Sequence, residues 1–291
     1  MEFYNILRNM KNIFFISLVS LFALNIISCA KDEEHSSTSS TSSTSNTSTD
    51  NTPELFITWG NSGTILTSSD NGTTWDNRTS GTSNGLYEIS YGNNTFVTVG
   101  PSGTILTSSD NGTTWNNRTS GTTVTLWGVT YGNSTFVTVG SSGVILSSSD
   151  GTTWDNRTSG TSNLLYGVNA VTYGNNTFVT VGDSGTILSS NGSISWPSRA
   201  RTSNDLKGVN YGKSTFVVVG ESGTILTSFD GASWTSRTSG TSNDLWGVAF
   251  ANNTFVVVGT SGTILTSSDG TTWDERTSGT TNTLWGVTYS Q

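Results

Sequence analysis

The chain has one cysteine and one histidine in 291 residues, and both lie within the first 35 positions. Cys29 therefore has no partner for an intrachain disulfide. Because every residue after His35 lacks thiol and imidazole groups, the rest of the chain excludes Ser-His-Asp triads, Cys-His pairs and typical zinc sites. We expect neither a metal ion nor another cofactor.

Charged residues and proline are also scarce, at 11% of the chain and three residues respectively, and the formal net charge is -8. Binding of nucleic acid needs clustered Lys and Arg, so a nucleic-acid partner is not expected. Gly, Ser, Thr and Asn are abundant, as in disordered chains, but ten Trp, twelve Phe and eight Tyr supply enough apolar surface for a core. The composition thus indicates a folded domain with many turns.

The first residues read as a secretion signal. Arg8 and Lys11 precede an apolar run, "IFFISLVSLFALNII" (13–27), which is shorter than the ~20 residues that a membrane-spanning helix needs. A basic start, a short apolar centre and small residues at the end predict a signal peptide over residues 1–28.

The segment "IISCA" around Cys29 resembles the lipobox of bacterial lipoproteins, although Leu is absent three residues before the cysteine. The resemblance implies that Cys29 is acylated and holds the protein on a membrane surface in the bacterial cell envelope, at the outer membrane or the cell surface. An ordinary signal peptide is the alternative. Residues 29–53 are rich in Ser and Thr and predict a flexible tether.

From residue 54 to residue 291 the sequence repeats one unit six times. Six tryptophans mark the copies, separated by 40, 39, 42, 38 and 39 residues: Trp75, Trp115, Trp154, Trp196, Trp234 and Trp273. A period near 40 is typical of four-stranded propeller blades. One copy shows four short β-like pieces, "LWGVTYG", "STFVTVG", "GVILSSS" and "TTWDNRTS", and no stretch has a helical apolar period. The prediction is an all-β, six-bladed β-propeller of four-stranded antiparallel blades.

The two ends of the repeat region are complementary. Residues 54–60, "ELFITWG", correspond to the second piece of a unit, and residues 284–290, "LWGVTYS", correspond to the first piece. We therefore expect the C-terminal strand to pair beside the first one, so that the ring closes and two open sheet edges disappear.

The turn "SSDNGTTW" (68–75) resembles the Asp-box repeat, also called the bacterial neuraminidase repeat. The resemblance, with Asn191 replacing Asp in the fourth copy, covers Asp70, Gly72, Trp75, Asp110, Gly112, Trp115, Asp150, Trp154, Trp196, Asp230, Trp234, Asp269 and Trp273. In this motif we expect Asp to accept backbone hydrogen bonds, Gly to permit a positive φ, and Trp to pack against neighbouring strands. These residues are expected to be structural, on the face opposite the binding face.

A wider resemblance, seen in "TYGNSTFVTVGSSGVILSSSDGTTW", is to the Ycf48/HCF136-like family of photosystem II assembly factors. It covers nearly all of residues 54–291 and implies a propeller fold. The resemblance says little about function, because proteins with unrelated activities share the propeller fold.

Departures from the repeat mark a candidate site. The loops of type "RTSGTSND" and the turns of type "VGxSG" are expected on one face, and "LLYGVNAVTYG" has gained three residues. The candidate binding residues on that face are Asp183, Arg201, Lys207 and Glu221. Neutral drift at exposed turns is the alternative.

Two further sets recur too regularly to mark a site. Arginines follow each tryptophan by three residues and are expected to stabilise each blade: Arg78, Arg118, Arg157, Arg199, Arg237 and Arg276. Aromatic residues near the start of the innermost strands are expected to pack between blades, and Lys207 replaces one of them: Tyr87, Trp127, Tyr166, Trp246 and Trp285.

The sequence predicts a monomeric, lipid-anchored propeller that binds a protein or glycan partner and has no catalytic residues. One alternative is a glycoside hydrolase, either sialidase-like or using a carboxylate pair such as Asp183 and Glu221. The F/Y-R-I-P motif of sialidases is absent. A second alternative is an assembly factor for a membrane complex, like Ycf48.

Overall fold

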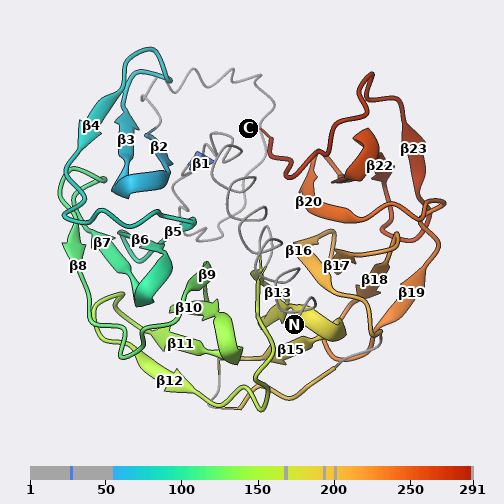
Figure 1. Cartoon of the computed structure of the whole chain (residues 1–291), viewed down its shortest axis with the longest axis horizontal. Coiled ribbons are helices and arrows are strands. Elements are labelled where there is room, and N and C mark those ends of the chain that lie inside the picture. The colour runs from blue at the N-terminus through green and yellow to red at the C-terminus, as the bar shows by residue number, and fades with distance from the viewer. Residues whose placement is uncertain (1–26, 29–54, 167–169, 193–194, 200–201, 290–291) are drawn as a thin grey trace, which may run out of the picture.

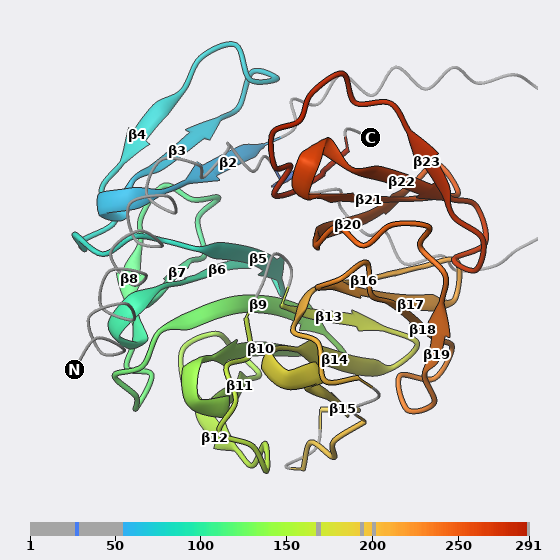
Figure 2. The ribbon, with the colours of Figure 1, turned by 45° about the vertical axis from the view of Figure 1, so that its right-hand side comes forward.

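The computed structural model describes residues 27–28, 55–166, 170–192, 195–199 and 202–289. They form six antiparallel sheets arranged around a common centre (Figure 1). Figure 2 shows consecutive sheets stacked face to face in chain order. The predicted all-β class of antiparallel sheets is confirmed. None of the described segments is a helix long and apolar enough to cross a bilayer.

Each sheet is built from strands that are consecutive in the sequence. The first three sheets contain β1 (Ile27–Ser28), β2 (Phe56–Trp59), β3 (Ile65–Ser68) and β4 (Asp76–Arg78); β5 (Glu88–Gly92), β6 (Thr95–Val99), β7 (Ile105–Ser108) and β8 (Asn116–Asn117); and β9 (Leu126–Gly132), β10 (Thr135–Gly140), β11 (Ile145–Ser148) and β12 (Asp155–Arg157).

The last three sheets follow the same plan, with one strand fewer in the fourth sheet. They contain β13 (Val171–Gly174), β14 (Thr177–Val181) and β15 (Ile187–Ser190); β16 (Leu206–Gly212), β17 (Thr215–Gly220), β18 (Ile225–Ser228) and β19 (Thr235–Arg237); and β20 (Leu245–Ala251), β21 (Thr254–Gly259), β22 (Ile264–Ser267) and β23 (Asp274–Arg276). In the fourth sheet the predicted outer strand is reduced to a single bridge between Leu188 and Ser198.

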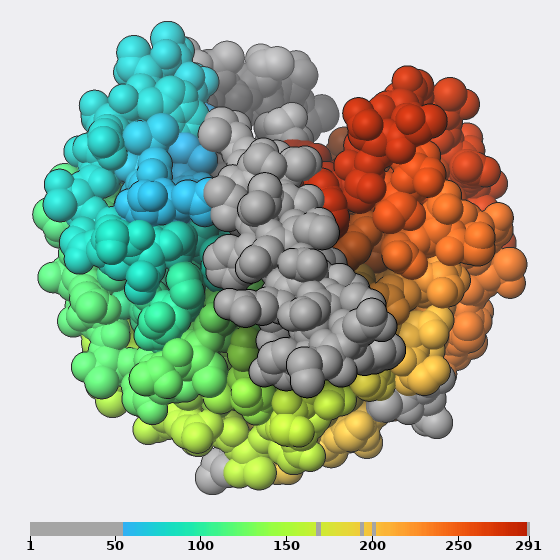
Figure 3. Space-filling view, in the orientation of Figure 1, coloured from blue at the N-terminus to red at the C-terminus, as the bar shows by residue number. Residues whose placement is uncertain are grey.

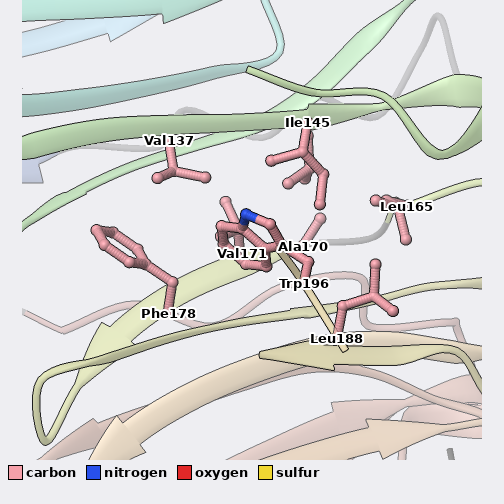
Figure 4. Packing of buried hydrophobic residues seen from close by; sticks show 9 residues of the cluster. Val137, Ile145, Leu165, Ala170, Val171, Phe178, Leu188 and Trp196 are labelled. Carbon is pink, nitrogen blue, oxygen red and sulfur yellow. The ribbon is translucent and has the colours of Figure 1, made fainter. Parts of the chain in front are cut away.

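The core lies between neighbouring sheets, because the strands carry β-branched and aromatic side chains on both faces. Val137 of β10, for example, lies in one buried cluster with Phe178 of β14 and Trp196 (Figure 4). Five clusters of this kind join the six sheets in chain order. A single sheet could not bury both of its faces, so the sheets stabilise one another.

The turns between the second and third strands recur with one geometry. Short 3-10 turns η1 to η5 occupy Asn61–Gly63, Pro101–Gly103, Ser141–Gly143, Asp183–Gly185 and Thr260–Gly262. They lie on the same face as the loops that lead into the next sheet, since Asn84 Nδ2 of one such loop donates to Thr104 Oγ1 beside η2 at 2.7 Å. The predicted assignment of these loops and turns to one face is confirmed.

The predicted pairing of the C-terminal strand with the first sheet is not present. Residues 284–289 form no strand, and the inner edge of β2 pairs instead with β1, through Ile27 opposite Ile57 and Ser28 opposite Phe56. Since β1 occupies the ladder positions that the C-terminal strand needs, both segments cannot hold them together. The last described residues run from the last sheet towards the first (Figure 1).

The predicted signal peptide and tether lie outside the described residues, apart from Ile27–Ser28 of β1. Cys29 and Arg201 also lie outside them. Their predicted roles therefore stay predictions.

Candidate functional site

The turns between the third and fourth strands form a network of hydrogen bonds. In the first sheet, Asp70 Oδ1 accepts from Ser68 Oγ at 2.7 Å and from the Thr74 amide at 2.9 Å. Thr74 Oγ1 donates to Asp70 Oδ2 at 2.6 Å, and these contacts with Thr74 and Ser68 lower the pKa of Asp70 to about 2. Gly72 has a φ of 81°, and its carbonyl accepts from Trp75 Nε1 at 3.0 Å.

The hydrogen bonds to the aspartate recur around Asp110, Asp150, Asp230 and Asp269. The bond from the tryptophan Nε1 recurs in the first three of these turns, but Trp273 Nε1 has no partner among the described residues. In all of these turns hydrogen bonds hold the pKa of the aspartate below its usual range. The contacts are local and internal to each turn, as expected for a structural motif.

The six recurring arginines are also structural. Each Nε donates to a hydroxyl of the neighbouring third strand, at 2.8 Å between Arg78 and Thr67 Oγ1 and at 2.6 Å between Arg157 and Ser147 Oγ. The guanidinium groups of Arg78, Arg157 and Arg276 also pair with an aspartate two residues earlier. The regular recurrence of these arginines therefore reflects the packing of each sheet.

The aromatic residues at the start of the inner strands contact one another across neighbouring sheets. Tyr87 and Trp127 stack with ring centroids 4.9 Å apart and an interplanar angle of 10°. Trp127 and Tyr166 are 6.5 Å apart, and Trp246 and Trp285 are 4.7 Å apart. Lys207 stands between the two groups, because its Nζ lies 4.9 Å from the Tyr166 ring centre and 5.3 Å from that of Trp246. We call this set the aromatic row.

Lys207 is buried among oxygen atoms. Its side chain is 4% exposed, and Nζ lies 3.1 Å from both Asp205 Oδ2 and Glu221 Oε1. Nζ also donates a short hydrogen bond to the Tyr166 hydroxyl. Burial alone would lower the pKa of Lys207, but these partners raise it above its usual value, so the amine stays charged.

The carboxylates around Lys207 differ in environment. Burial and the charge of Asp205 raise the pKa of Asp183. Burial also acts to raise the pKa of Asp205. Two interactions outweigh it and lower this pKa overall: the Ser184 amide donates to Asp205 Oδ1 at 2.8 Å, and Lys207 lies beside the carboxylate. Burial also raises the pKa of Tyr166 to about 12. We call Tyr166, Asp183, Asp205, Lys207 and Glu221 the Lys207 cluster.

Of the four candidate residues, the structure brings Asp183, Lys207 and Glu221 into one cluster. The sequence reasoning missed Asp205, because the related copy "TSNDL" carries Asp244 at the same place and the residue therefore reads as part of the repeat. Both aspartates accept a backbone amide of a neighbouring turn, at 2.8 Å from Ser184 and 2.9 Å from Ser222.

Glu88 is a second residue that the sequence reasoning missed. It replaces the glycine found at this position in the other copies, for example with "YE" in place of "WG". This substitution could have identified Glu88 from the sequence. Its Oε2 accepts from the Val129 amide at 3.1 Å. Burial raises the pKa of Glu88 to about 8, against the lowering effect of that hydrogen bond, so the carboxyl group is mostly protonated at neutral pH.

Two shallow hollows of about 640 and 780 Å³ lie away from the Lys207 cluster. Both are lined by Ser, Thr and Gly of equivalent loops, around Thr119–Thr123 and Thr277–Thr281. Because the same surface recurs with the repeat, we assign it to the fold. Among the described residues no group of three or more His, Cys, Asp or Glu is placed to hold a metal ion.

No protein-family model matches the chain, and no curated protein matches it in sequence. Solved structures do resemble it. One described as YCF48 bound to D1 peptide has a TM-score of 0.60 at 20% identity and covers 76% of each chain. The WD40 β-propeller domain of Doa1 has a TM-score of 0.60 at 14% identity and covers 80% of this chain and 82% of that one.

The GH74 enzyme of Niastella koreensis has a TM-score of 0.52 at 19% identity over 76% of this chain, which spans only 35% of the enzyme. At these identities the likeness shows the fold alone. The chain has a β-propeller fold.

Proposed function

We propose that the chain is a non-catalytic binding propeller, lipid-anchored at Cys29 in a bacterial envelope, whose Lys207 cluster contacts a protein partner. The observation that carries the proposal is the concentration of charged groups at one place on a face that is otherwise regular. Two of its members are partly exposed, with side-chain exposures of 30% for Asp205 and 40% for Glu221. A similar propeller is described as bound to a D1 peptide, which supports a peptide segment as the kind of ligand.

A protein segment fits this face better than a glycan does. Sugar binding by aromatic residues needs open ring faces, but Tyr87 and Trp127 stack on each other, and so cover part of their faces. The charged groups of the Lys207 cluster are those that commonly recognise polypeptide side chains.

The binding face would be rigid in a closed ring, and several observations support closure by residues 284–290. The amide of Leu284 already donates to the Gly259 carbonyl at 2.9 Å, just as Leu126 donates to Gly100 at 3.0 Å between the second and third sheets. Trp285 contacts Trp246 and so extends the aromatic row. Closure would complete that row between Trp285 and Tyr87.

Photo-crosslinking in the native envelope tests the proposed function. A crosslinking residue at Ser203, an exposed position in the loop before Asp205, should capture one protein. The same residue at Thr73, an exposed position in a turn at the opposite end of the strands, should not. Lys207→Met should remove the Ser203 product. Equal products from Ser203 and Thr73, or none from Ser203, would contradict the proposal.

A glycosidase is the second candidate, because the Lys207 cluster holds carboxyl groups whose pKa values shift in opposite directions, as in Asp183 and Asp205. Hydrolysis of fluorogenic glycosides that is lost in Asp183→Asn or Glu221→Gln would favour it over the binding function. A role in assembling a membrane complex is one form that the binding function could take.

A further inference from the structure

The inner edge of β2 pairs with a strand that directly precedes the predicted lipidation site. β1 runs antiparallel to β2 (Figure 1), with Ile27 opposite Ile57 and Ser28 opposite Phe56. The next residue is Cys29, so β1 is the last part of the predicted signal peptide. The inner edge of β2 is therefore held by a segment that removal of the signal peptide would take away.

The C-terminal segment fits the same edge in the same register. In the third sheet, Tyr131 of β9 lies opposite Phe136 of β10. The repeat puts Tyr289 and Phe56 at the equivalent positions of the C-terminal segment and of β2. Tyr289 would thus take the place that Ser28 holds opposite Phe56, with its strand running in the same direction. The two segments exclude each other.

The C-terminal segment already lies against the last sheet. A Cβ on Gly247 of β20 would be 3.0 Å from Gly286 Cα and 3.1 Å from the Trp285 oxygen, so the two backbones touch. Tyr289 is exposed, whereas its counterpart in β9 packs on a buried Phe with ring centroids 4.6 Å apart. Among the described residues, the segment thus contacts the last sheet but does not pair with β2.

We propose that β1 blocks ring closure in the unprocessed chain and that removal of the signal peptide lifts the block. A signal peptidase hydrolyses the peptide bond between Ser28 and Cys29. Water supplies a hydroxyl group to the Ser28 carbonyl carbon and a hydrogen to the Cys29 nitrogen as the C–N bond breaks. Residues 1–28 then leave with β1, and residues 284–289 pair with β2. The inference rests on the lipid anchor and the ring closure of the proposed function, and it names the step that controls closure.

The order of synthesis and the number of paired residues explain why the block forms and why its removal closes the ring. β1 precedes β2 closely in the chain, so it pairs as soon as β2 forms, before the last sheet has been made. It makes only two residue pairs with β2, whereas β9 makes six with β10. Once β1 has left, the C-terminal segment can form the longer ladder, and the cleaved strand does not return.

Hydrogen–deuterium exchange followed by mass spectrometry tests the inference on the protein in detergent. Cys29→Ala keeps the chain unprocessed, and the parent purified from its envelope supplies the processed form. The amides of residues 284–289 should exchange about tenfold or more slowly in the processed form, because pairing with β2 protects them. Strand β9 is the internal control and should exchange equally in both forms.

A second variant removes the block without processing. Ile27→Pro with Ser28→Pro, made in the Cys29→Ala chain, takes both amide groups from β1 and should slow exchange of residues 284–289. The matched control places two prolines in the predicted tether, at Ser36 and Ser37. Equal exchange of residues 284–289 in the processed and unprocessed forms, or no effect of the β1 prolines, would overturn the inference.

The mass of the purified parent separates this inference from the proposed function. A parent that keeps residues 1–28 would overturn both the lipid anchor and the processing step. A processed, acylated parent in which residues 284–289 exchange as fast as in the Cys29→Ala chain would overturn the block alone. In that case the anchor stands, and capture of a partner from Ser203 still decides the binding function.

Discussion

The regular sheets differ from the first sheet, whose inner edge forms the junction with the last sheet. In the regular sheets, a glycine at the end of the second strand lies against a backbone carbonyl just before the first strand of the same sheet, so that a Cβ on Gly100 would be 2.3 Å from the Gly85 oxygen. The corresponding Gly60 of the first sheet has nothing within 4 Å. By register, the oxygen that is missing there belongs to Thr283.

The aromatic residues show the same contrast. Phe136, Phe178, Phe216 and Phe255 are fully buried, and each packs with a Tyr or Phe of the inner strand, whereas Phe56 is only half-buried. The expected partner of Phe56 is Tyr289, which is 49% exposed. The space-filling view also shows the first and last sheets standing apart at one edge (Figure 3). The junction therefore has the residues of a regular contact without its packing.

Deleting residues 284–291 should have the largest effect. If the C-terminal segment closes the ring, its removal exposes the apolar sides of two sheets and leaves two open edges. We expect a loss of about 5 kcal/mol in the free energy of unfolding, from two or three large side chains at about 1.5–3 kcal/mol each. Thermal melting measures it, with deletion of residues 36–43 as the control. A deletion variant that melts like the parent would show that the ring stays open.

A pair of glycine variants sharpens the same comparison. Gly100→Ala should destabilise the protein by about 1–3 kcal/mol, because the new methyl group meets the Gly85 carbonyl. Gly60→Ala should cost about as much in a closed ring, where Thr283 would hold the equivalent position. In an open ring Gly60→Ala is neutral or slightly stabilising. Urea unfolding midpoints of the two variants decide between these cases.

Lys207→Met tests a charged contact between the fourth and fifth sheets, in which Lys207 binds the Tyr166 hydroxyl. The substitution leaves Asp205 and Glu221 without their cation, and we expect a loss of about 1–2 kcal/mol, reduced by the partial exposure of both carboxylates. Lys213→Met is the control, since the hydrogen bond of that exposed amine within the described part of the chain is to the Ser268 carbonyl, at 2.9 Å. Equal melting temperatures of the two variants would mean that Lys207 contributes little to this contact.

The period of the sequence predicted the sheets well, because each copy carries its own turn signals and its own alternation of apolar residues. The Lys207 cluster was found in part, since Lys207 replaces the aromatic residue of the other copies, and Asp183 and Glu221 occupy a turn position that differs in every copy. Asp205 was not predicted as a site residue because Asp244 occupies the same position in another copy. Glu88 was not predicted either, although it replaces a glycine. The pairing at the junction could not be read from the sequence, because β2 presents one edge to which two segments of the chain are complementary.

The aspartate turns test whether the junction affects the first sheet as a whole. The hydrogen bonds around Asp70 match those around Asp110 of the second sheet, and the pKa of each is about 2. These turns should therefore be equally formed. Because the folded-state pKa lies below the ordinary value of 3.8, each turn stabilises the fold above pH 4 and loses that contribution as the pH falls towards 2.

Asp70→Asn and Asp110→Asn should lower the melting temperature slightly and equally at pH 7, and the difference from the parent should vanish near pH 2. Asp76→Asn is the control in the first sheet, because the exposed Asp76 takes no part in the turn and pairs with Arg78, at 2.9 Å. A smaller effect of Asp70→Asn than of Asp110→Asn would mean that the open junction loosens the first sheet as far as its outer turn. Equal effects of the two substitutions on the melting temperature would mean that the irregular packing is limited to the inner edge of β2.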